Sequence, residues 1–528
     1  MKKNVISLMV LLFLALYINA QEKEAENTYA ITGKSKRGTL ADVKYDGSQY
    51  LLTYVTKSTG TKIHLQEYYF DIDFKFIKME EDELEIQKAK EKYTWVNYNG
   101  DLYTVEGNTV EANLTGTLVL KKKRITYKYD WLLLGYNKTV EILNKVKPKT
   151  DDGRKFFYYT HAEDDNTGDI YVLCGIKANM QDVKKDKKLA YKHNLDMVVL
   201  KFNSDLEIVK EVPISFDYPN QNIFARTIFN NSDDSTAPSV GGMSFVFAPV
   251  GGPGLNKYAD PNNCNYRYIG IDNELNIKND IKFESNASYW KIDDQIIDVS
   301  TGETFLYGPL AEGKDKYYNM SLNTTKFKAV QLMKINNGKM EYLTQTNLDE
   351  FKSKLKTPPS QKKAPAYDGK HFEIAAYKLA ANGDLLVLGQ NKDDKGYKDV
   401  IAFHFDDKGH LKAQYGLDIL ENNNLTKANP AAQMLLNSND GKSLYWLLLE
   451  IRGTTTWSSK PLMYPRIGKI DLDNANITDF QSFGTIGKDK YYLDPKVPFL
   501  ETNEGGKIVF FGSDKAGKNL WFCRVKLN

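Results

Sequence analysis

A short unit recurs along the chain, and it restricts the fold more than any other feature of the sequence. GDLLVLG (Gly383–Gly389) aligns without gaps with GKIVFFG (Gly506–Gly512), and GETFLYG (Gly302–Gly308) follows the same pattern. Looser copies begin at Gly47, Gly100, Gly168, Gly241 and Gly441, and the successive starts of all eight copies are 53 to 81 residues apart. Each copy is a turn glycine followed by a short apolar strand with aromatic or β-branched residues.

Each copy is flanked by further predicted strands, so the repeating unit is larger than the motif. A shorter strand precedes the glycine, as in FEIAAYKLAANGD (372–384). After the motif comes an apolar strand, an Asp/Asn turn and an alternating strand, as in VLKFNSDLEIVKE (199–211). Each unit therefore holds four strands, named a to d in chain order, with tight polar turns between a and b and between c and d.

Four antiparallel strands repeated in this way predict an all-β β-propeller with about eight four-stranded blades. Seven blades is the alternative, if the second and third units merge. Aligning RVKLN at the end of the chain with VLKFN (199–203) puts Asn528 at the end of a strand c. We expect NTYAITG (27–33) to supply the missing strand d, which would complete the last blade, close the ring and cover a sheet edge.

One domain is expected over residues 21–528, with 347–371 as a long loop between blades. The competing interpretation is two all-β domains joined by a linker at 356–369, KTPPSQKKAPAYDG. We favour the single domain because the same repeat continues on both sides of this segment. Helix is expected only at NLDEFKSKLK (347–356), where Leu348, Phe351 and Leu355 share one face.

Residues 1–20 have the layout of a cleavable secretory signal. Two lysines precede an apolar run from Val5 to Tyr17, and small residues come before Gln21. The run is short for a membrane span, so an uncleaved anchor is the weaker alternative. We expect a mature protein that does not span a membrane, in the periplasm or secreted beyond it; the sequence does not decide between periplasm and cell surface.

Charge and cysteine content exclude several classes of function. Residues 1–20 contain two of the 71 basic residues and none of the 68 acidic ones, so the mature chain is close to neutral. This balance says little about an anionic membrane as partner, and we expect no nucleic-acid partner. The three cysteines, Cys174, Cys264 and Cys523, allow at most one disulfide. Cys174 and Cys523 lie in apolar strand patterns and are expected to be buried.

Loop lengths distinguish the two edges of the predicted blades. Most a–b and c–d turns are short, whereas many b–c connections are long, notably 175–194, 248–265, 309–326 and 451–465. In a propeller the b–c and d–a connections share one face, and the 347–371 segment is a d–a connection. Long loops on a rigid scaffold commonly carry binding residues. The sequence therefore predicts a binding face there.

The candidate binding residues are aromatic and basic side chains of these loops. They are Tyr191, Tyr258, Tyr317, Tyr318, Trp457, Tyr464, Lys184, Lys185, Lys187 and Lys188. Exposed aromatic rings suit stacking on sugars or anchoring of a protein partner. The alternative is structural: the rings pack on their own blades and the lysines form a solvated surface.

Catalytic and metal-binding patterns are weak. The six histidines are scattered, and neither HExxH nor GxSxG occurs. DDNTGD (164–169) and DLDNAN (471–476) resemble parts of calcium loops but lack the full set of ligands. Both fall where the repeat needs a hairpin turn, for which Asp, Asn and Gly are ordinary residues. We predict no metal and no cofactor.

The architecture resembles that of secreted Bacteroidetes-type β-propeller proteins, although WD dipeptides and kelch signatures are absent. The leading hypothesis is a non-enzymatic binding or scaffold propeller that engages a protein partner at the bacterial cell envelope through its long-loop face. One version resembles the periplasmic accessory proteins that dock on the outer-membrane translocon of type 9 secretion. The main alternative is a carbohydrate-active or other hydrolytic propeller with a site at the channel mouth. Surface adhesion is a third hypothesis.

Overall fold

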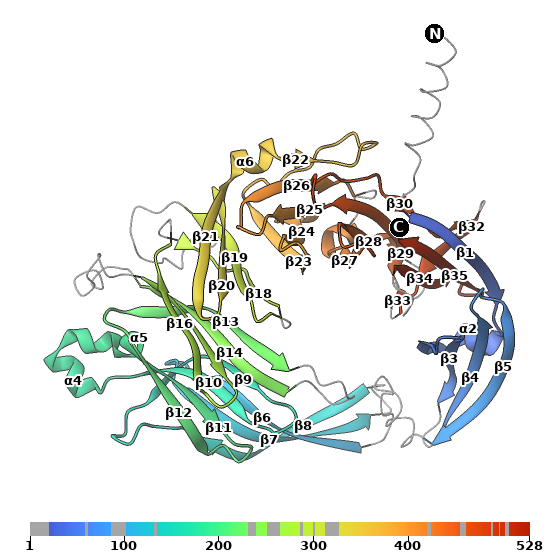
Figure 1. Ribbon diagram of the computed structural model, residues 1–528. Helices are drawn as coiled ribbons and strands as arrows, with labels where there is room; N and C mark the ends of the chain where they lie inside the picture. Colours follow the sequence, from blue (N-terminus) through green and yellow to red (C-terminus); the bar gives the residue numbers. More distant parts are fainter. Residues whose placement is uncertain are drawn as a thin grey trace, which may run out of the picture. The chain divides into compact units, whose positions relative to one another are not determined.

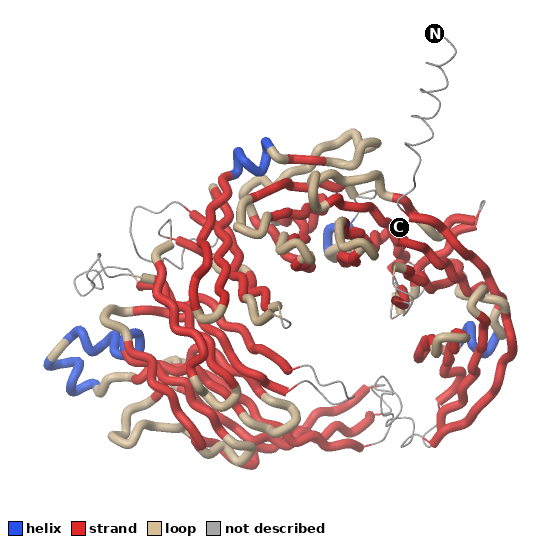
Figure 2. The backbone as a smooth tube through the Cα atoms, in the orientation of Figure 1, coloured by secondary structure: helices blue, strands red, loops and turns tan. Residues whose placement is uncertain are grey.

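The computed structural model is built almost entirely of β-strands (Figures 1 and 2). It describes residues 21–527 except 59–61, 86–101, 131–134, 231–238, 251–264, 286–288, 299–300, 312–326, 420–423, 455–460, 487–488, 496 and 502–505. The predicted signal lies outside the described residues. The chain divides into two compact units, Met1–Asn99 with Leu348–Asn528 (unit 1) and Gly100–Asn347 (unit 2). The single domain over 21–528 stays a prediction.

The described strands of unit 1 form four sheets. One sheet has the order β2 (Thr39–Tyr45), β3 (Gln49–Ser58), β4 (Lys62–Asp71), β5 (Phe76–Glu85). A second has β22 (Leu355–Lys356), β26 (Leu411–Leu417), β25 (Gly396–Phe405), β24 (Leu385–Asp393), β23 (His371–Leu379). A third has β27 (Ala432–Asn437), β28 (Ser443–Thr454), β29 (Pro461–Asp471), β30 (Gln481–Ser482). The closing sheet has β1 (Gln21–Ala30), β35 (Asn519–Leu527), β34 (Lys507–Asp514), β32 (Asp489–Leu493), β31 (Thr485–Ile486), with β33 (Phe499–Glu501) also paired to β34.

The described strands of unit 2 form four more sheets. The first has β6 (Leu102–Ala112), β7 (Leu118–Asp130), β8 (Gly135–Val146). The second has β12 (Ile208–Ser215), β11 (Asp196–Phe202), β10 (Ile170–Ile176), β9 (Phe156–Glu163). The third has β13 (Asn220–Asn230), β14 (Ser239–Pro249), β15 (Tyr266–Asp272), β16 (Ile277–Phe283). The fourth has β17 (Tyr289–Trp290), β19 (Thr304–Ala311), β20 (Ala329–Asn336), β21 (Lys339–Asn347), with β18 (Asp294–Ile297) also on β19.

Helices in the described residues are short and lie between strands. They are α2 (Gly33–Arg37), α4 (Met180–Lys185), the 3₁₀ turn η1 (Lys187–Tyr191), α5 (Lys192–Leu195), α6 (Leu348–Ser353) and α7 (Asn424–Ala428). The helix predicted at 347–356 is present as α6. In the part of the chain that the structure describes, no helix has the length and apolar character needed to cross a membrane.

The sheets follow the predicted a–b–c–d order, and eight of them are found in the described residues. The prediction of an all-β fold of the β-propeller class, with about eight blades, is confirmed. The sheet β6–β8 has three described strands, and the residues before Gly100, where a strand a is expected, lie outside the described residues. The closure of the whole ring stays a prediction.

The recurring motif has a physical explanation at both of its ends. Its first glycine closes the a–b turn with a positive φ, as at Gly302 (75°), Gly383 (86°) and Gly506 (82°). Its last glycine lets strand a approach closely: a Cβ on Gly389 would lie 2.2 Å from the carbonyl oxygen of Glu373. Gly308 and Gly512 are crowded in the same way, because a Cβ on either glycine would meet a backbone carbonyl oxygen of the chain segment that precedes strand b.

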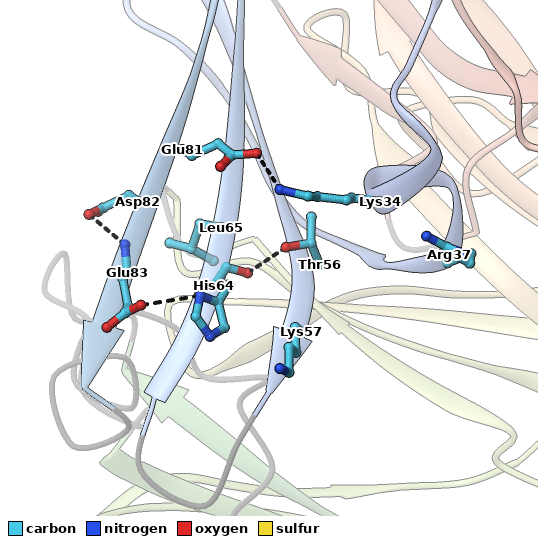
Figure 3. A pocket seen from close by; sticks show the side chains of 9 residues that line it. All are labelled: Lys34, Arg37, Thr56, Lys57, His64, Leu65, Glu81, Asp82 and Glu83. Atoms are coloured by element: carbon cyan, nitrogen blue, oxygen red, sulfur yellow. Dashed lines mark hydrogen bonds and ion pairs between the residues drawn. The ribbon is translucent and has the colours of Figure 1, made fainter.

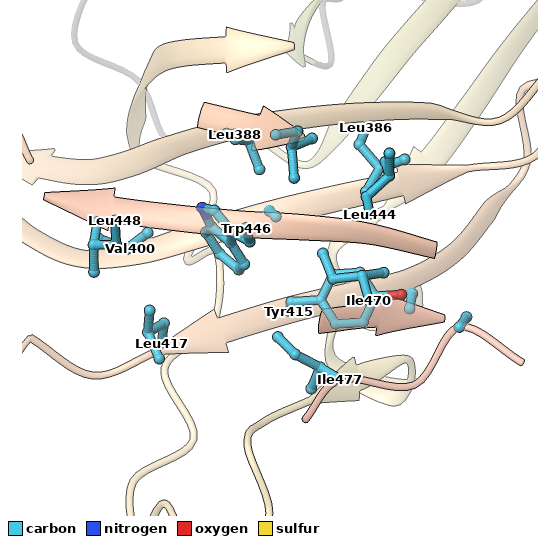
Figure 4. Close-up of a cluster of buried hydrophobic side chains, with 14 of the residues drawn as sticks. Leu386, Leu388, Val400, Tyr415, Leu417, Leu444, Trp446, Leu448, Ile470 and Ile477 are labelled. Carbon is cyan, nitrogen blue, oxygen red and sulfur yellow. The ribbon is translucent and has the colours of Figure 1, made fainter. Parts of the chain in front are cut away.

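Residues between these glycines are buried on both faces of each sheet, which explains why strand b is a continuous apolar run. In β28, Trp446 and Leu448 pack against Leu388 and Leu417 of the sheet β23–β26 (Figure 4). The alternate residues Tyr445 and Leu447 face the closing sheet. Phe511 and Phe522 of the closing sheet then pack against the sheet β2–β5. Unit 2 repeats this face-to-face packing between consecutive sheets.

The N-terminal strand completes the last sheet, as predicted. β1 pairs antiparallel with β35 from Gln21 opposite Leu527 to Ala30 opposite Asn519, with one irregularity between Lys23 and Ala25. The strand is longer than the predicted segment 27–33, because it begins at Gln21 and ends at Ala30.

The segment 347–371 is anchored to the sheet β23–β26 of unit 1. Gln414 of β26 donates from Nε2 to the carbonyl of Phe351 over 3.1 Å, and its Oε1 accepts from the backbone N–H of Tyr367 over 2.7 Å. The Phe351 and Tyr367 side chains are buried. Residues 356–369 are therefore part of unit 1 and do not form a linker between the two units.

Candidate binding edge

Strand order gives every sheet of unit 1 two different edges. At one end of the strands, strand b turns into strand c and strand d leads to the next sheet. We name this side of the sheet, which is formed by strand ends and not by an edge strand, the b–c edge. The opposite edge carries the a–b and c–d turns. Two pockets of unit 1 lie at its b–c edge, one on the sheet β2–β5 and one between the sheet β27–β30 and the closing sheet. This is the edge at which the loop lengths predict binding.

The first of these, the α2 pocket, has a volume of about 550 Å³ (Figure 3). Its lining residues come from α2 and from the ends of β3, β4 and β5 that lie at the b–c edge: Lys34, Arg37, Thr56, Lys57, His64, Leu65, Glu81, Asp82 and Glu83. Figure 3 shows the basic side chains of α2 on one side of the hollow and the acidic residues of β5 on the other.

A buried polar network positions α2. Thr32 caps the helix by accepting from the backbone N–H of Ser35 over 3.3 Å. The hydroxyls of Thr32 and Ser35 both donate to Oε1 of Gln66 in β4, over 2.5 and 2.6 Å. The Tyr68 hydroxyl also lies 3.0 Å from Ser35 Oγ. Because these groups satisfy one another, the short helix is held firmly on the sheet.

Two of the three carboxylates that line the α2 pocket pair with cations. Glu81 accepts from Lys34 Nζ over 2.8 Å and from Gln66 Nε2 over 2.8 Å. Glu83 accepts from Lys62 and lies 3.3 Å from Nδ1 of His64. The hydrogen bond from Lys34 lowers the pKa of Glu81, and that from Lys62 lowers the pKa of Glu83. The lowered pKa keeps both carboxylates ionised near neutral pH, as their pairing with cations requires.

The second pocket, the Tyr464 pocket, has a volume of about 400 Å³. It is lined by Arg452, Tyr464, Ser482, Phe483, Thr485, Lys490 and Tyr492. The rings of Tyr464 and Tyr492 lie 4.9 Å apart at 40°. The Arg452 guanidinium lies over the Tyr464 ring, with 5.2 Å between its carbon and the centroid. Together they form a cation–aromatic surface.

Arg452 lies beside a buried ion pair. Glu450 is buried and pairs with Arg466 over 3.0 Å, while its distance to Arg452 is 3.8 Å. Burial lowers the pKa of Arg466, and the Coulombic attraction of Glu450 opposes that effect. Nε of Arg452 is buried and has no hydrogen-bond partner among the described residues. The 3.8 Å between its Nη2 and Glu450 is too long for a hydrogen bond, so the terminal Nη2 keeps donor capacity.

Tyr464 itself corrects one expectation from the sequence. It was expected in the b–c loop 451–465, but it lies in β29, opposite Glu450 of β28, and only 8% of it is exposed. The hairpin strands are longer than the pattern indicates, running to Thr454 and restarting at Pro461. It lines the pocket from a strand, and its ring packs on Tyr492 of the neighbouring sheet.

The other predicted binding residues are only partly described. Tyr258, Tyr317, Tyr318 and Trp457 lie outside the described residues. Lys184 and Lys185 are exposed in α4, Lys187 is exposed in η1, and Lys188 and Tyr191 also belong to η1, where Tyr191 is half-buried. These residues lie in the long b–c connection between β10 and β11 of unit 2. Their role in binding stays a prediction.

The two segments that resemble calcium loops use their first carboxylates in turns. Asp164 accepts from the backbone N–H of Asn166 over 2.9 Å and of Val240 over 2.8 Å. Asp471 accepts from the backbone N–H groups of Asp473 and Asn474, each over 2.9 Å. Both therefore serve as turn residues, as the alternative interpretation states.

A buried group that the sequence did not reveal lies in the sheet β23–β26. Nε2 of His404 lies 2.8 Å from Asp384, and its Nδ1 lies 2.9 Å from the Tyr415 hydroxyl. Lys412 also donates to Asp384 over 2.9 Å. His404 is fully buried, so this network has no access for a substrate and holds strands b, c and d together.

The fold is that of a β-propeller-class protein, and two pockets lined by charged and aromatic side chains lie at the b–c edge of unit 1. No family model and no curated protein matches the sequence. Solved structures similar to this chain include the WD40 domain of SCAP from fission yeast. The two are 7% identical, the match covers 96% of this chain and 98% of the SCAP domain, and the TM-score is 0.26.

Two further similar structures have the same low level of likeness. A DUF4221-family protein from Bacteroides vulgatus has 11% identity, 72% and 96% coverage, and a TM-score of 0.23. A GH43 β-1,3-galactosidase has 12% identity, 92% and 88% coverage, and a TM-score of 0.20. Because the TM-scores are low, neither fold nor function is inferred from these structures.

Proposed function

We propose that this chain is a non-enzymatic binding module of the bacterial cell envelope, exported through a cleaved signal, that engages a protein partner through the b–c edge of unit 1. The proposal rests on the linings of the two pockets at this edge. Both contain cations, which are accompanied by acidic side chains in the α2 pocket and by aromatic rings in the Tyr464 pocket, and both stand on rigid sheets. Arginine and tyrosine are enriched at protein interfaces and at their energetic centres.

Charge pairing in the α2 pocket also supports a binding role. The side chains of Lys34 and Glu81 are both more than half exposed, at 61% and 55%. Exposed ion pairs of this kind stabilise a fold little, so a partner can exchange them for its own charges at small cost. Such exchange gives specificity and a fast encounter with a partner of complementary charge.

Site-specific photo-cross-linking in the cells that naturally make the protein tests the proposal. A benzoylphenylalanine replaces Lys57, which lines the α2 pocket, and in a matched variant it replaces Lys408, an exposed residue of the c–d turn at the opposite edge. We expect a discrete protein adduct from position 57 and none from position 408. No adduct at 57, or equal adducts at both positions, would contradict binding at the b–c edge.

Two finer assignments depend on the identity of the adduct. An outer-membrane secretion component in the adduct would support the role of translocon accessory. The hydrolytic alternative instead requires two facing carboxylates, one of them with a raised pKa. In the α2 pocket the shifts at Glu81 and Glu83 have the opposite sign.

A further inference from the structure

We propose that the Tyr464 pocket anchors a glutamate or aspartate side chain of the protein partner, with Arg452 and Lys490 as the residues that bind its carboxylate. This inference rests on the proposed function and specifies the chemistry of the partner. It follows from the charge, the unused donor capacity and the shape of the pocket.

The charge of the pocket is positive. Arg452 and Lys490 are among its lining residues, and none of the lining residues is acidic. Lys490 is exposed and makes no ion pair with any described residue. The nearest carboxylate to Arg452 is Glu450, which stands behind the pocket and is already neutralised by Arg466 at 3.0 Å. The α2 pocket differs, because its lining includes Glu81, Asp82 and Glu83, and its Lys34 is paired with Glu81.

Arg452 has donors available for a ligand. Its Nη2 lies 3.8 Å from Glu450, which is longer than a hydrogen bond, so this terminal nitrogen can still donate to a ligand. A guanidinium binds a carboxylate best through two parallel N–H donors, which fixes orientation as well as charge. Stacking on Tyr464 holds the guanidinium plane in place without using its donors.

The shape of the pocket suits the side chain of a partner residue. Gly484 has a φ of 94°, and a Cβ there would lie 2.7 Å from the Tyr491 carbonyl oxygen and 3.2 Å from Tyr464. This turn therefore brings the backbone against the Tyr464 ring. The rings of Tyr464 and Tyr492 form an apolar wall for the methylene groups of a glutamate, while Thr485 and Ser482 add hydroxyls.

Binding of a fluorescent acetyl-hexaglutamate amide to the mature protein, measured by anisotropy, tests the inference. The wild type is expected to bind this probe and not acetyl-hexaglutamine amide. Arg452→Gln and Lys490→Gln should each weaken binding at least about tenfold, since a hydrogen bond to a charged group contributes about 1.5–3 kcal/mol. Lys408→Gln, at the opposite edge, should leave binding unchanged.

Lys490 is exposed, so Lys490→Gln remains informative if Arg452→Gln fails to fold; melting curves identify that case. No binding of hexaglutamate, or an equal loss with Lys408→Gln, overturns the inference. Digalacturonate binding that depends on Arg452, without hexaglutamate binding, overturns it in favour of an acidic-sugar site. If hexaglutamate does not bind while position 57 still cross-links, the acidic anchor is wrong and the proposed function stands; if both fail, both are wrong.

Discussion

The carboxylate of Glu26 accepts a hydrogen bond of 2.9 Å from the indole Nε1 of Trp521, although 495 positions separate the two residues in the sequence. Trp521 is fully buried, so its N–H would lack a partner without Glu26. The bond is part of the seam between β1 and β35, in which Glu26 lies opposite Cys523. The start of the described chain is thereby tied into the last sheet.

Glu26→Ala is expected to lower the free energy of unfolding by about 1–3 kcal/mol, because it leaves a buried donor unsatisfied. Glu26→Gln keeps an acceptor and should cost less. Glu22→Ala, an exposed glutamate of the same strand, is the matched control and should have little effect. Urea denaturation followed by tryptophan fluorescence measures all three. Equal losses for Glu26→Ala and Glu22→Ala would show that the seam does not depend on this bond.

Gly389→Ala is expected to destabilise the sheet β23–β26 by about 1–3 kcal/mol, the cost of overpacking a well-filled site. Its Cβ would meet the carbonyl oxygen of Glu373 at 2.2 Å, so strands β23 and β24 must separate. Gly33→Ala is the control, because a Cβ at Gly33 has open space and its φ is not positive. That variant should be neutral or slightly stabilising. Thermal unfolding compares the two.

This glycine spacing explains why the fold could be predicted. In the three motifs that start at Gly302, Gly383 and Gly506, the close-approach glycine follows the turn glycine by six residues. The burial of alternate residues such as Trp446 and Tyr445 on opposite faces gives strand b its apolar run. Both signals are local in the sequence. The β1–β35 pairing followed from counting strands, since one unit lacked its strand d.

The pockets could not be predicted because no local pattern defines them. Lys34 and Glu81 are 47 positions apart and meet only through the order of strands. Arg452 and Lys490 belong to different sheets and look like ordinary surface cations in the sequence. Tyr464 was predicted in the long b–c connection 451–465, but β29 already begins at Pro461 and contains it.

Cys174 and Cys523 are expected to resist iodoacetamide in the folded protein at mildly alkaline pH and to react in concentrated urea. Both side chains are buried, as predicted from their strand patterns, and burial raises the pKa of both thiols. The reactive thiolate is therefore scarce and inaccessible. Peptide mapping by mass spectrometry reports each cysteine separately. Rapid labelling of either residue under native conditions would contradict its buried position.

Acid should remove the stabilising effect of Asp384. Burial alone would raise the pKa of this carboxyl, but hydrogen bonds from His404, Lys412 and Asn382 outweigh burial and lower it. A carboxyl whose pKa is lower in the folded state contributes stability above its unfolded pKa, about 3.9, and loses that contribution as the pH falls through its folded value. Asp384→Asn should therefore cost about 1–3 kcal/mol near neutral pH.

The difference in unfolding free energy between wild type and Asp384→Asn should then shrink as the pH falls below about 4. Urea denaturation over a pH series measures this difference. Asp407→Asn serves as the control, because Asp407 is an exposed carboxylate of the c–d turn in the same sheet and its difference from wild type should stay small throughout. A cost for Asp384→Asn that is independent of pH would mean that the residue acts through packing and not through its charge. The network around His404 would then stabilise the three strands by shape alone.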